Sequence, residues 1–183
     1  YILGDKSDKR IRDVKLDSNI ISAYQQFGIY SFNTDSLLVN INHIENARSE
    51  NAMGVVNEDA CASRIIRNKV SDYGIVGIGL YAENSGTSKS SILINNMVFG
   101  ESSYTSSFTP SYGLEVNNSA RIQILNNSIL FNSKNNPYNN SGVDYLPSAA
   151  RFVDATGLSA INNIFINNST SARSVALVND NTT

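Results

Sequence analysis

Acidic and basic side chains recur in this 183-residue sequence at intervals that could bring them onto one surface. Glu58, Glu83, Glu115 and Arg151 each follow a small residue by two or four positions. Glu58 and Glu83 are expected one repeat apart, where their repulsion would raise the pKa of one carboxyl, and retaining glycosidases use such closely spaced acids. Glu83, Glu115 and Arg151 are therefore the candidate catalytic residues. The alternative is a solvated face whose charges only keep a sheet soluble.

Tyrosines accompany these charged residues at equivalent positions. A tyrosine ring can stack on the apolar face of a sugar while its hydroxyl forms a hydrogen bond. Two long segments, 97–112 and 128–148, contribute further tyrosines and are expected to be loops beside the same face. The candidate substrate-binding residues are Tyr30, Tyr81, Glu58, Asn117, Tyr112 and Tyr145.

Repeated short segments must position these side chains. An asparagine-rich column recurs at Asn19, His43, Asn68, Asn96, Asn127 and Asn163, and most of its neighbours two positions away are apolar. A column of small residues recurs at Gly28, Gly54, Gly79, Gly113, Ala149 and Ser174, each followed by an apolar residue. A period near 25 without helical periodicity is typical of a β-solenoid, whose rungs stack about 4.8 Å apart. The sequence predicts about six to seven rungs with an internal asparagine ladder, in which His43 replaces one asparagine.

Composition narrows the function classes. The chain contains 26 Asn and 26 Ser, which are poor in helix interiors, so a helix bundle is excluded. A net charge of −2 gives no basic surplus for binding nucleic acid.

No apolar run is long enough to span a membrane. One His and one Cys make a zinc site implausible, so no metal site is expected, and Ca²⁺ between loops, through Asp144 and Asp154, is supported by no spacing.

Two segments carry a family resemblance. Gly113-Leu114-Glu115-Val116 followed by 121–129, and the segment 161–165, resemble repeats of the pectate-lyase-like superfamily. The resemblance implies an all-β, right-handed, single-stranded parallel β-helix. It also implies a polysaccharide partner lying along the outward face of one sheet, and an extracellular or cell-surface location. Lyases of this superfamily use Arg or Lys as a base near a uronate, and Arg151 is the only basic residue expected on that face.

Two functions remain open, because this superfamily holds both enzymes and non-catalytic proteins. The first is a carbohydrate-associated β-helix that binds, and in the enzymatic case cleaves, a polysaccharide as a lyase or glycoside hydrolase. The second is a non-catalytic surface adhesin, spike or structural stalk segment. The chain is expected to form one domain, 1–183, with a polar lead-in at 1–13. Open strand edges at both ends predict contact with other parts of a longer chain or with another copy.

Overall fold

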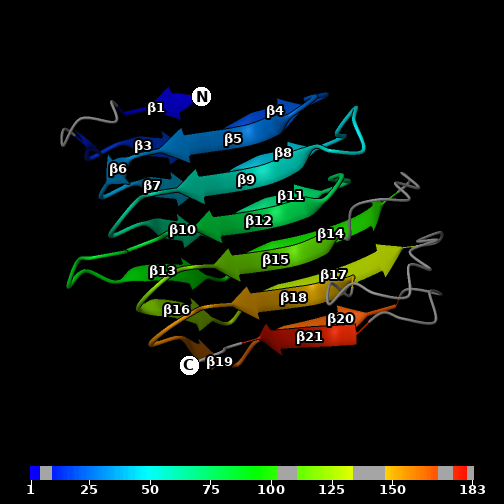
Figure 1. Ribbon diagram of the computed structural model, residues 1–183. Coiled ribbons are helices and arrows are strands. Elements are labelled where there is room, and N and C mark those ends of the chain that lie inside the picture. Colours follow the sequence, from blue (N-terminus) through cyan, green and yellow to red (C-terminus); the bar gives the residue numbers. More distant parts are fainter. Residues whose placement is uncertain (5–9, 103–110, 134–146, 169–174, 181–183) are drawn as a thin grey trace.

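The chain winds as a parallel β-helix in which three stacked sheets form the walls (Figure 1). This computed structural model describes residues 1–4, 10–102, 111–133, 147–168 and 175–180. The described residues form strands, turns and bends without a helix, and the strands pair in parallel. The predicted all-β parallel solenoid is confirmed.

Sheet I has seven strands and faces the viewer in Figure 1. Its members in spatial order are β1 (Ile2–Leu3), β5 (Phe27–Phe32), β9 (Met53–Glu58), β12 (Val76–Tyr81), β15 (Tyr112–Asn117), β18 (Ser148–Val153) and β21 (Val175–Asp180). Strands of successive windings pair, so residues 23 to 36 positions apart become neighbours.

Sheets II and III each have six strands and form the other walls. Sheet II contains β3 (Lys15–Asp17), β7 (Leu38–Asn40), β10 (Arg64–Ile66), β13 (Ser91–Ile94), β16 (Ile122–Leu125) and β19 (Ser159–Ile161). Sheet III contains β4 (Ile20–Ser22), β8 (His43–Glu45), β11 (Lys69–Ser71), β14 (Met97–Ser102), β17 (Ser128–Ser133) and β20 (Ile164–Asn167). A short pair, β2 (Ile11–Arg12) and β6 (Thr34–Asp35), lies at one corner.

Aliphatic columns fill the space between the walls. On sheet II, Val39, Ile65, Leu93 and Ile124 are paired in register and almost inaccessible to solvent. Equivalent positions on sheets I and III are also buried in one continuous core. Because each rung covers the apolar side chains of the next, the core runs along the helix axis.

An asparagine ladder lies at the corner between sheets II and III. Asn68 donates from its backbone N and from Nδ2 to Oδ1 of Asn96, each at 3.0 Å. The same two bonds recur at each step, and the ladder residues are Asn19, Asn42, Asn68, Asn96, Asn127 and Asn163. Side-chain amides thereby satisfy backbone groups that the corner would otherwise bury unpaired.

The assignment of His43 to this ladder is wrong. Asn42 occupies that rung, while His43 begins β8 and its Nε2 lies 3.1 Å from Oε2 of Glu45 on the outer side of sheet III. The residue before each ladder asparagine has a positive φ, including 53° at Ile41 and 56° at Asn95. Asparagine tolerates this left-handed conformation better than most residues, which explains the repeated Asn-Asn pairs.

The small-residue column marks where sheet I approaches sheet III. A Cβ on Gly54 would lie 2.4 Å from Cγ1 of Val70 and 2.5 Å from the carbonyl oxygen of Gly77. The third member of this column is therefore Gly77, and the predicted Gly79 is wrong by two residues. Gly79 instead pairs with Val56 and Glu115.

Candidate functional site

The outer face of sheet I carries most of the predicted site residues. Side chains alternate between the two sides of a strand, and Leu80 and Val116 belong to the inner core. One outward column consists of Tyr30, Val56, Gly79, Glu115 and Arg151. The next consists of Phe32, Glu58, Tyr81, Asn117, Val153 and Asp180. The register thus brings Tyr30, Glu58, Tyr81, Glu115, Asn117 and Arg151 onto one face.

The buried cluster, defined as Tyr81, Tyr112, Glu115 and Arg151, joins β12, β15 and β18. Arg151 donates from Nη1 to Oε1 of Glu115 at 2.6 Å, and the Tyr81 hydroxyl donates to Oε2 at 2.7 Å. The guanidinium carbon of Arg151 lies 5.1 Å from the centre of the Tyr112 ring. Glu115 and Arg151 are only 6% and 5% exposed. Burial and the neighbouring Glu115 carboxylate raise the pKa of Tyr81, so its phenol stays protonated as a donor.

Gly79 makes room for the Tyr81 ring. A Cβ on Gly79 would lie 2.6 Å from Cε2 and 2.9 Å from the hydroxyl oxygen of Tyr81. The ring therefore lies across Gly79 toward Glu115, which is paired with Gly79 in the next strand. A side chain at position 79 would block this route.

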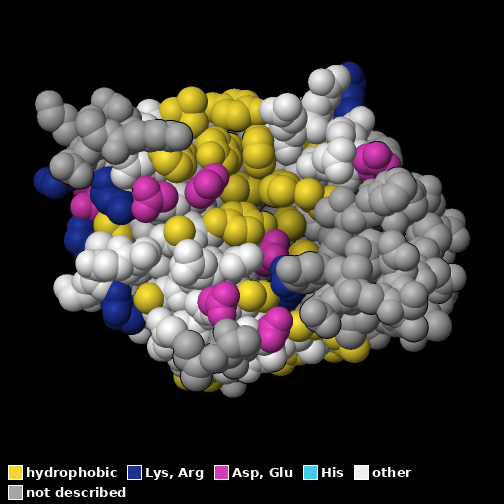
Figure 2. All heavy atoms as spheres, in the orientation of Figure 1, with side chains coloured by type: hydrophobic (Ala, Val, Ile, Leu, Met, Phe, Trp, Pro, Cys, Tyr) yellow, Lys and Arg dark blue, Asp and Glu magenta, His cyan; other side chains and the backbone are white. Residues whose placement is uncertain are grey.

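An aromatic platform, defined as Tyr1, Phe27 and Tyr30, occupies the N-terminal part of the same face. The ring centres of Phe27 and Tyr30 are 4.7 Å apart, and Tyr1 lies 5.9 Å from Phe27 and 5.8 Å from Tyr30. The Tyr30 hydroxyl donates to Oε2 of Glu58 at 2.8 Å. Burial and this bond raise the pKa of Tyr30 to about 12. Figure 2 shows hydrophobic side chains gathered over β5, β9 and β12, with acidic side chains beside them.

The placement of Glu83 on the outer face is wrong. Strand β12 ends at Tyr81, and Ala82 turns the chain with a φ of 53°. Glu83 is fully buried in a polar interior corner, where its carboxylate accepts hydrogen bonds from Asn57 Nδ2 and Ser91 Oγ. Burial raises the pKa of Glu83. It neither stacks beside Glu58 nor joins Glu115, so the expected pair of neighbouring outward acids does not form.

Among the remaining predicted residues, Asn117 lies outward at the end of β15 and is partly exposed. Tyr112 joins the buried cluster rather than a loop. Tyr145 falls outside the described residues, as do 103–110 and 134–146 of the two long segments. The expectation that these segments are loops throughout is wrong, because they begin as β14 and β17 of sheet III.

Sequence reasoning missed Tyr1, Phe27 and Gly79. Tyr1 belongs to the segment expected to be a polar lead-in, and only the pairing of β1 with β5 brings that segment to the face. Phe27 directly precedes Gly28 of the small-residue column, so the position before the small residue could have been included among the candidate binding positions. Gly79 was assigned to the wrong column.

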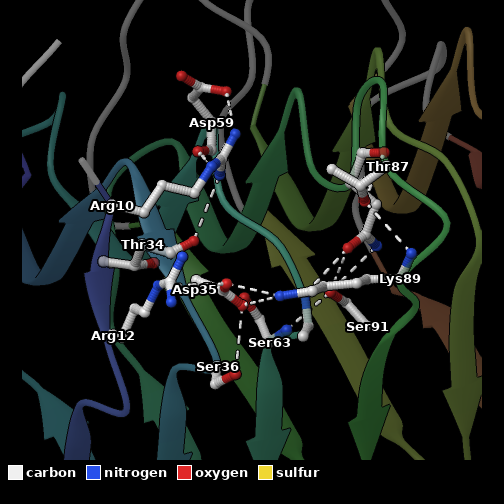
Figure 3. A network of polar contacts seen from close by, with 12 residues as sticks. Arg10, Arg12, Thr34, Asp35, Ser36, Asp59, Ser63, Thr87, Lys89 and Ser91 are labelled. Carbon is white, nitrogen blue, oxygen red and sulfur yellow. Dashed lines mark hydrogen bonds and ion pairs between the residues drawn. The ribbon is translucent and has the colours of Figure 1, made fainter. Parts of the chain in front are cut away.

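A second polar group lies at the corner near β2 and β6 (Figure 3). Lys89 Nζ donates to both carboxylate oxygens of Asp35, at 2.6 and 2.5 Å, and holds the pKa of Asp35 below its usual value. Arg10 donates to the backbone oxygen of Asp59 at 2.6 Å and to its Oδ1 at 3.3 Å. The bonded residues lie 54 and 49 positions apart, which is two windings, so each of these contacts ties three windings together at this corner.

Two hollows lie away from sheet I. One of about 360 Å³ lies on the outer face of sheet III and is lined mainly by apolar side chains, so it lacks polar groups to orient a sugar. Another, of about 390 Å³, lies among turns and includes Thr87, Arg121 and Asp154. Arg121 is already bonded to the backbone oxygens of Asn84 and Lys89.

The described residues contain no group of three or more His, Cys, Asp or Glu side chains that could hold a metal ion. Asp144 lies outside these residues, so the structure does not test calcium between Asp144 and Asp154. In the part of the chain that the structure describes, no helix is suited to crossing a membrane.

Comparison with known proteins gives a structural likeness. No protein-family model matches the sequence, and no curated protein sequence matches it. A mutant of the periplasmic alginate epimerase AlgG has a similar structure, with a TM-score of 0.51 and 16% identity over 93% of this chain and 40% of that chain. A double mutant of the same epimerase gives a TM-score of 0.49 and 16% identity, covering 94% of this chain and 43% of that one. The chain thus spans about two fifths of the epimerase, and the likeness to the first mutant establishes that the fold is a right-handed parallel β-helix.

Proposed function

We propose that this chain is an extracytoplasmic β-helix that binds a polysaccharide along the outer face of sheet I. The observation that carries the proposal is the aromatic platform of Tyr1, Phe27 and Tyr30, which continues directly into the acceptor Glu58. The rings are tilted against one another by 35° to 89°, and together they present apolar area beside a hydrogen-bonding group. Such a surface matches a sugar, which presents an apolar face and a rim of hydroxyls.

The dimensions of the sheet support an extended ligand. Strands in a sheet are spaced about 4.8 Å apart, so seven strands span roughly 30 Å. Phe27 and Tyr30 of the platform lie on β5, and Glu115 of the buried cluster lies on β15, three strands further along. A chain of several sugars could therefore touch the platform and the region of Glu115 at once. The fold is also one that a polysaccharide-modifying enzyme, the alginate epimerase, uses.

Catalysis, if present, would involve Glu115 and Arg151. Both Glu115 carboxylate oxygens already accept hydrogen bonds, from Arg151 and from Tyr81. A group that takes a proton from a substrate needs to reach it, and here the substrate would first have to displace one of these partners. This closed arrangement favours the second candidate, a non-catalytic surface protein that binds glycans without cleaving them.

The test combines a binding panel with product detection. Neutral and uronic-acid polysaccharides are titrated against the protein, and reducing ends and unsaturated products are measured. We expect Tyr30→Ala to weaken glycan binding at least about tenfold, because stacking area and the bond to Glu58 are both lost. Phe99→Ala is the matched control, since Phe99 is a partly exposed aromatic residue on sheet III.

Binding that is lost in Tyr30→Ala and kept in Phe99→Ala supports the proposal. Wild-type affinity in Tyr30→Ala, or no binding to any glycan in the panel, overturns it. Product formation that disappears in Glu115→Gln would decide for the enzyme over the non-catalytic surface protein.

A further inference from the structure

The outer face of sheet I is acidic in its described part. Its three outward columns carry the carboxylates of Glu58, Glu115 and Asp180 against the single guanidinium of Arg151. The third of these columns, which contains Phe27, Met53, Val76 and Tyr112, adds no charge. A polyanion approaching this face would meet a net negative field.

The one cation in the described strands of this face is already engaged. Arg151 is 5% exposed, bonds Glu115 at 2.6 Å and packs against the Tyr112 ring. A sugar carboxylate would reach little of this buried guanidinium unless it displaced Glu115. That exchange would leave the carboxylate of Glu115, which is 6% exposed, without its counter-charge, and this is strongly unfavourable.

The accessible acceptor of the face is Glu58. Its Oε2 accepts the Tyr30 hydroxyl, and its Oε1 has no hydrogen-bond partner among the described residues. A carboxylate accepts hydrogen bonds and cannot donate them. A sugar hydroxyl satisfies this oxygen, whereas a sugar carboxylate beside it is repelled.

Resting on the proposed function, we infer that the ligand is a neutral polysaccharide rather than a polyuronate. The Glu58 carboxylate beside the platform accepts hydrogen bonds from hydroxyl groups. Arg151 is bonded to Glu115, so it does not offer its positive charge to the carboxylate of a uronate. The fold is thus shared with an alginate epimerase, but the charge of this face suits a different class of glycan.

The experiment compares a neutral glucan and a neutral galactomannan with alginate and polygalacturonate by calorimetry. Measurements are made in chelator at low and at high NaCl. We expect at least one neutral glycan to bind about tenfold or more tightly than either polyuronate at low salt, because the face repels anions. Added salt should narrow the difference, since it screens repulsion between exposed charges.

A charge variant sharpens the test. Glu58→Gln should weaken binding of the neutral glycan about fivefold and strengthen that of the polyuronates, because it replaces a charged acceptor and removes repulsion. Glu45→Gln is the matched control, since it removes the same charge from sheet III. We expect it to leave both affinities unchanged.

The failures are distinguishable. Tighter binding of a polyuronate in chelator overturns the inference and leaves the proposed function standing. Polyuronate binding that requires added Ca²⁺ also overturns it, because a bound cation would then supply the missing positive charge. Absence of binding to every glycan overturns the proposed function itself.

Discussion

Two tyrosine–glutamate pairs on the outer face of sheet I use the same hydrogen bond in different surroundings. Tyr30 donates to Glu58 at 2.8 Å, and Tyr81 donates to Glu115 at 2.7 Å. Glu115 has Arg151 on its second oxygen and is nearly inaccessible, whereas Glu58 is partly exposed and its second oxygen has no described partner. The same tyrosine–glutamate bond is thus part of a buried structural unit, the locked pair, where Arg151 binds the second carboxylate oxygen. It leaves an open acceptor, the open pair, at Glu58, where no described cation binds.

The largest difference between the two pairs should appear in the free energy of unfolding when a charge is removed from each pair. Arg151→Met leaves the buried Glu115 without its counter-charge, so we expect the free energy of unfolding to fall by about 3–5 kcal/mol. Glu58→Gln, at the open pair, should cost less than about 1 kcal/mol. Urea denaturation measures both.

The double variant Glu115→Leu, Arg151→Met is the control. It removes both charges, and we expect it to regain most of the stability lost in Arg151→Met. Equal losses in Arg151→Met and Glu58→Gln would show that the two pairs do not differ in the way described.

Gly79→Ala should damage only the locked pair. The added Cβ would overlap the Tyr81 ring, displacing it from Glu115 at an expected cost of about 1–3 kcal/mol. Denaturation of Gly79→Ala is compared in the wild-type and Tyr81→Ala backgrounds. With the ring removed, the cost should largely disappear. A cost that persists in Tyr81→Ala would mean that the backbone, rather than the ring, requires glycine.

Alkaline titration should separate the two phenols. The pKa of Tyr30 is raised to about 12 from 10.0, so the stabilising contribution of its neutral form is complete below pH 10 and is lost as the pH rises through about 12. Phenolate absorbance missing from Tyr30→Phe identifies this step, and Glu58→Gln should move its midpoint toward 10.0. Tyr81 should ionise only when the chain unfolds, because burial and Glu115 raise its pKa further. Ionisation of Tyr81 in the native protein near pH 10 would contradict this.

The smallest effect is expected for Tyr30→Phe. It removes one hydrogen bond at a partly exposed position and leaves the ring, so the free energy of unfolding should fall by about 0.5–1 kcal/mol. Tyr81→Phe should cost more, because it withdraws a donor from the buried Glu115 carboxylate. Thermal unfolding of the two variants side by side checks the order.

Much of the architecture could be predicted from the sequence, because the ladder imposes one residue type at one corner. Asn68, Asn96, Asn127 and Asn163 align as predicted. The error at His43 arises because the residue two positions before the ladder, apolar in most rungs, is Asn40 in this rung, so a pattern anchored on Ile41 shifts by one residue. Only the pairing of Asn40 with Ile66 places Asn42 at the corner.

The candidate site was harder to predict because strand alternation is insensitive to a two-residue shift. Choosing Gly79 instead of Gly77 preserved the inside–outside pattern, so Tyr81 was still placed outward. The same choice extended the strand to Glu83, which the left-handed turn at Ala82 directs inward. The placement of Glu115 and Arg151 on one face followed from their equivalent positions in the repeat, but their ion pair and its burial could not be read from spacing.

The directional asparagine bonds have a consequence for how such a molecule changes length. Each ladder residue donates to the next one along the chain, over separations that grow from 23 to 36 residues while the bond lengths stay near 2.9 Å. The ladder bonds therefore require one asparagine per winding, and they do not depend on how many residues the winding contains. Deleting the residues from one ladder asparagine to the next would remove one rung and leave the same asparagine contact at the new junction. The protein can therefore lengthen or shorten by whole rungs.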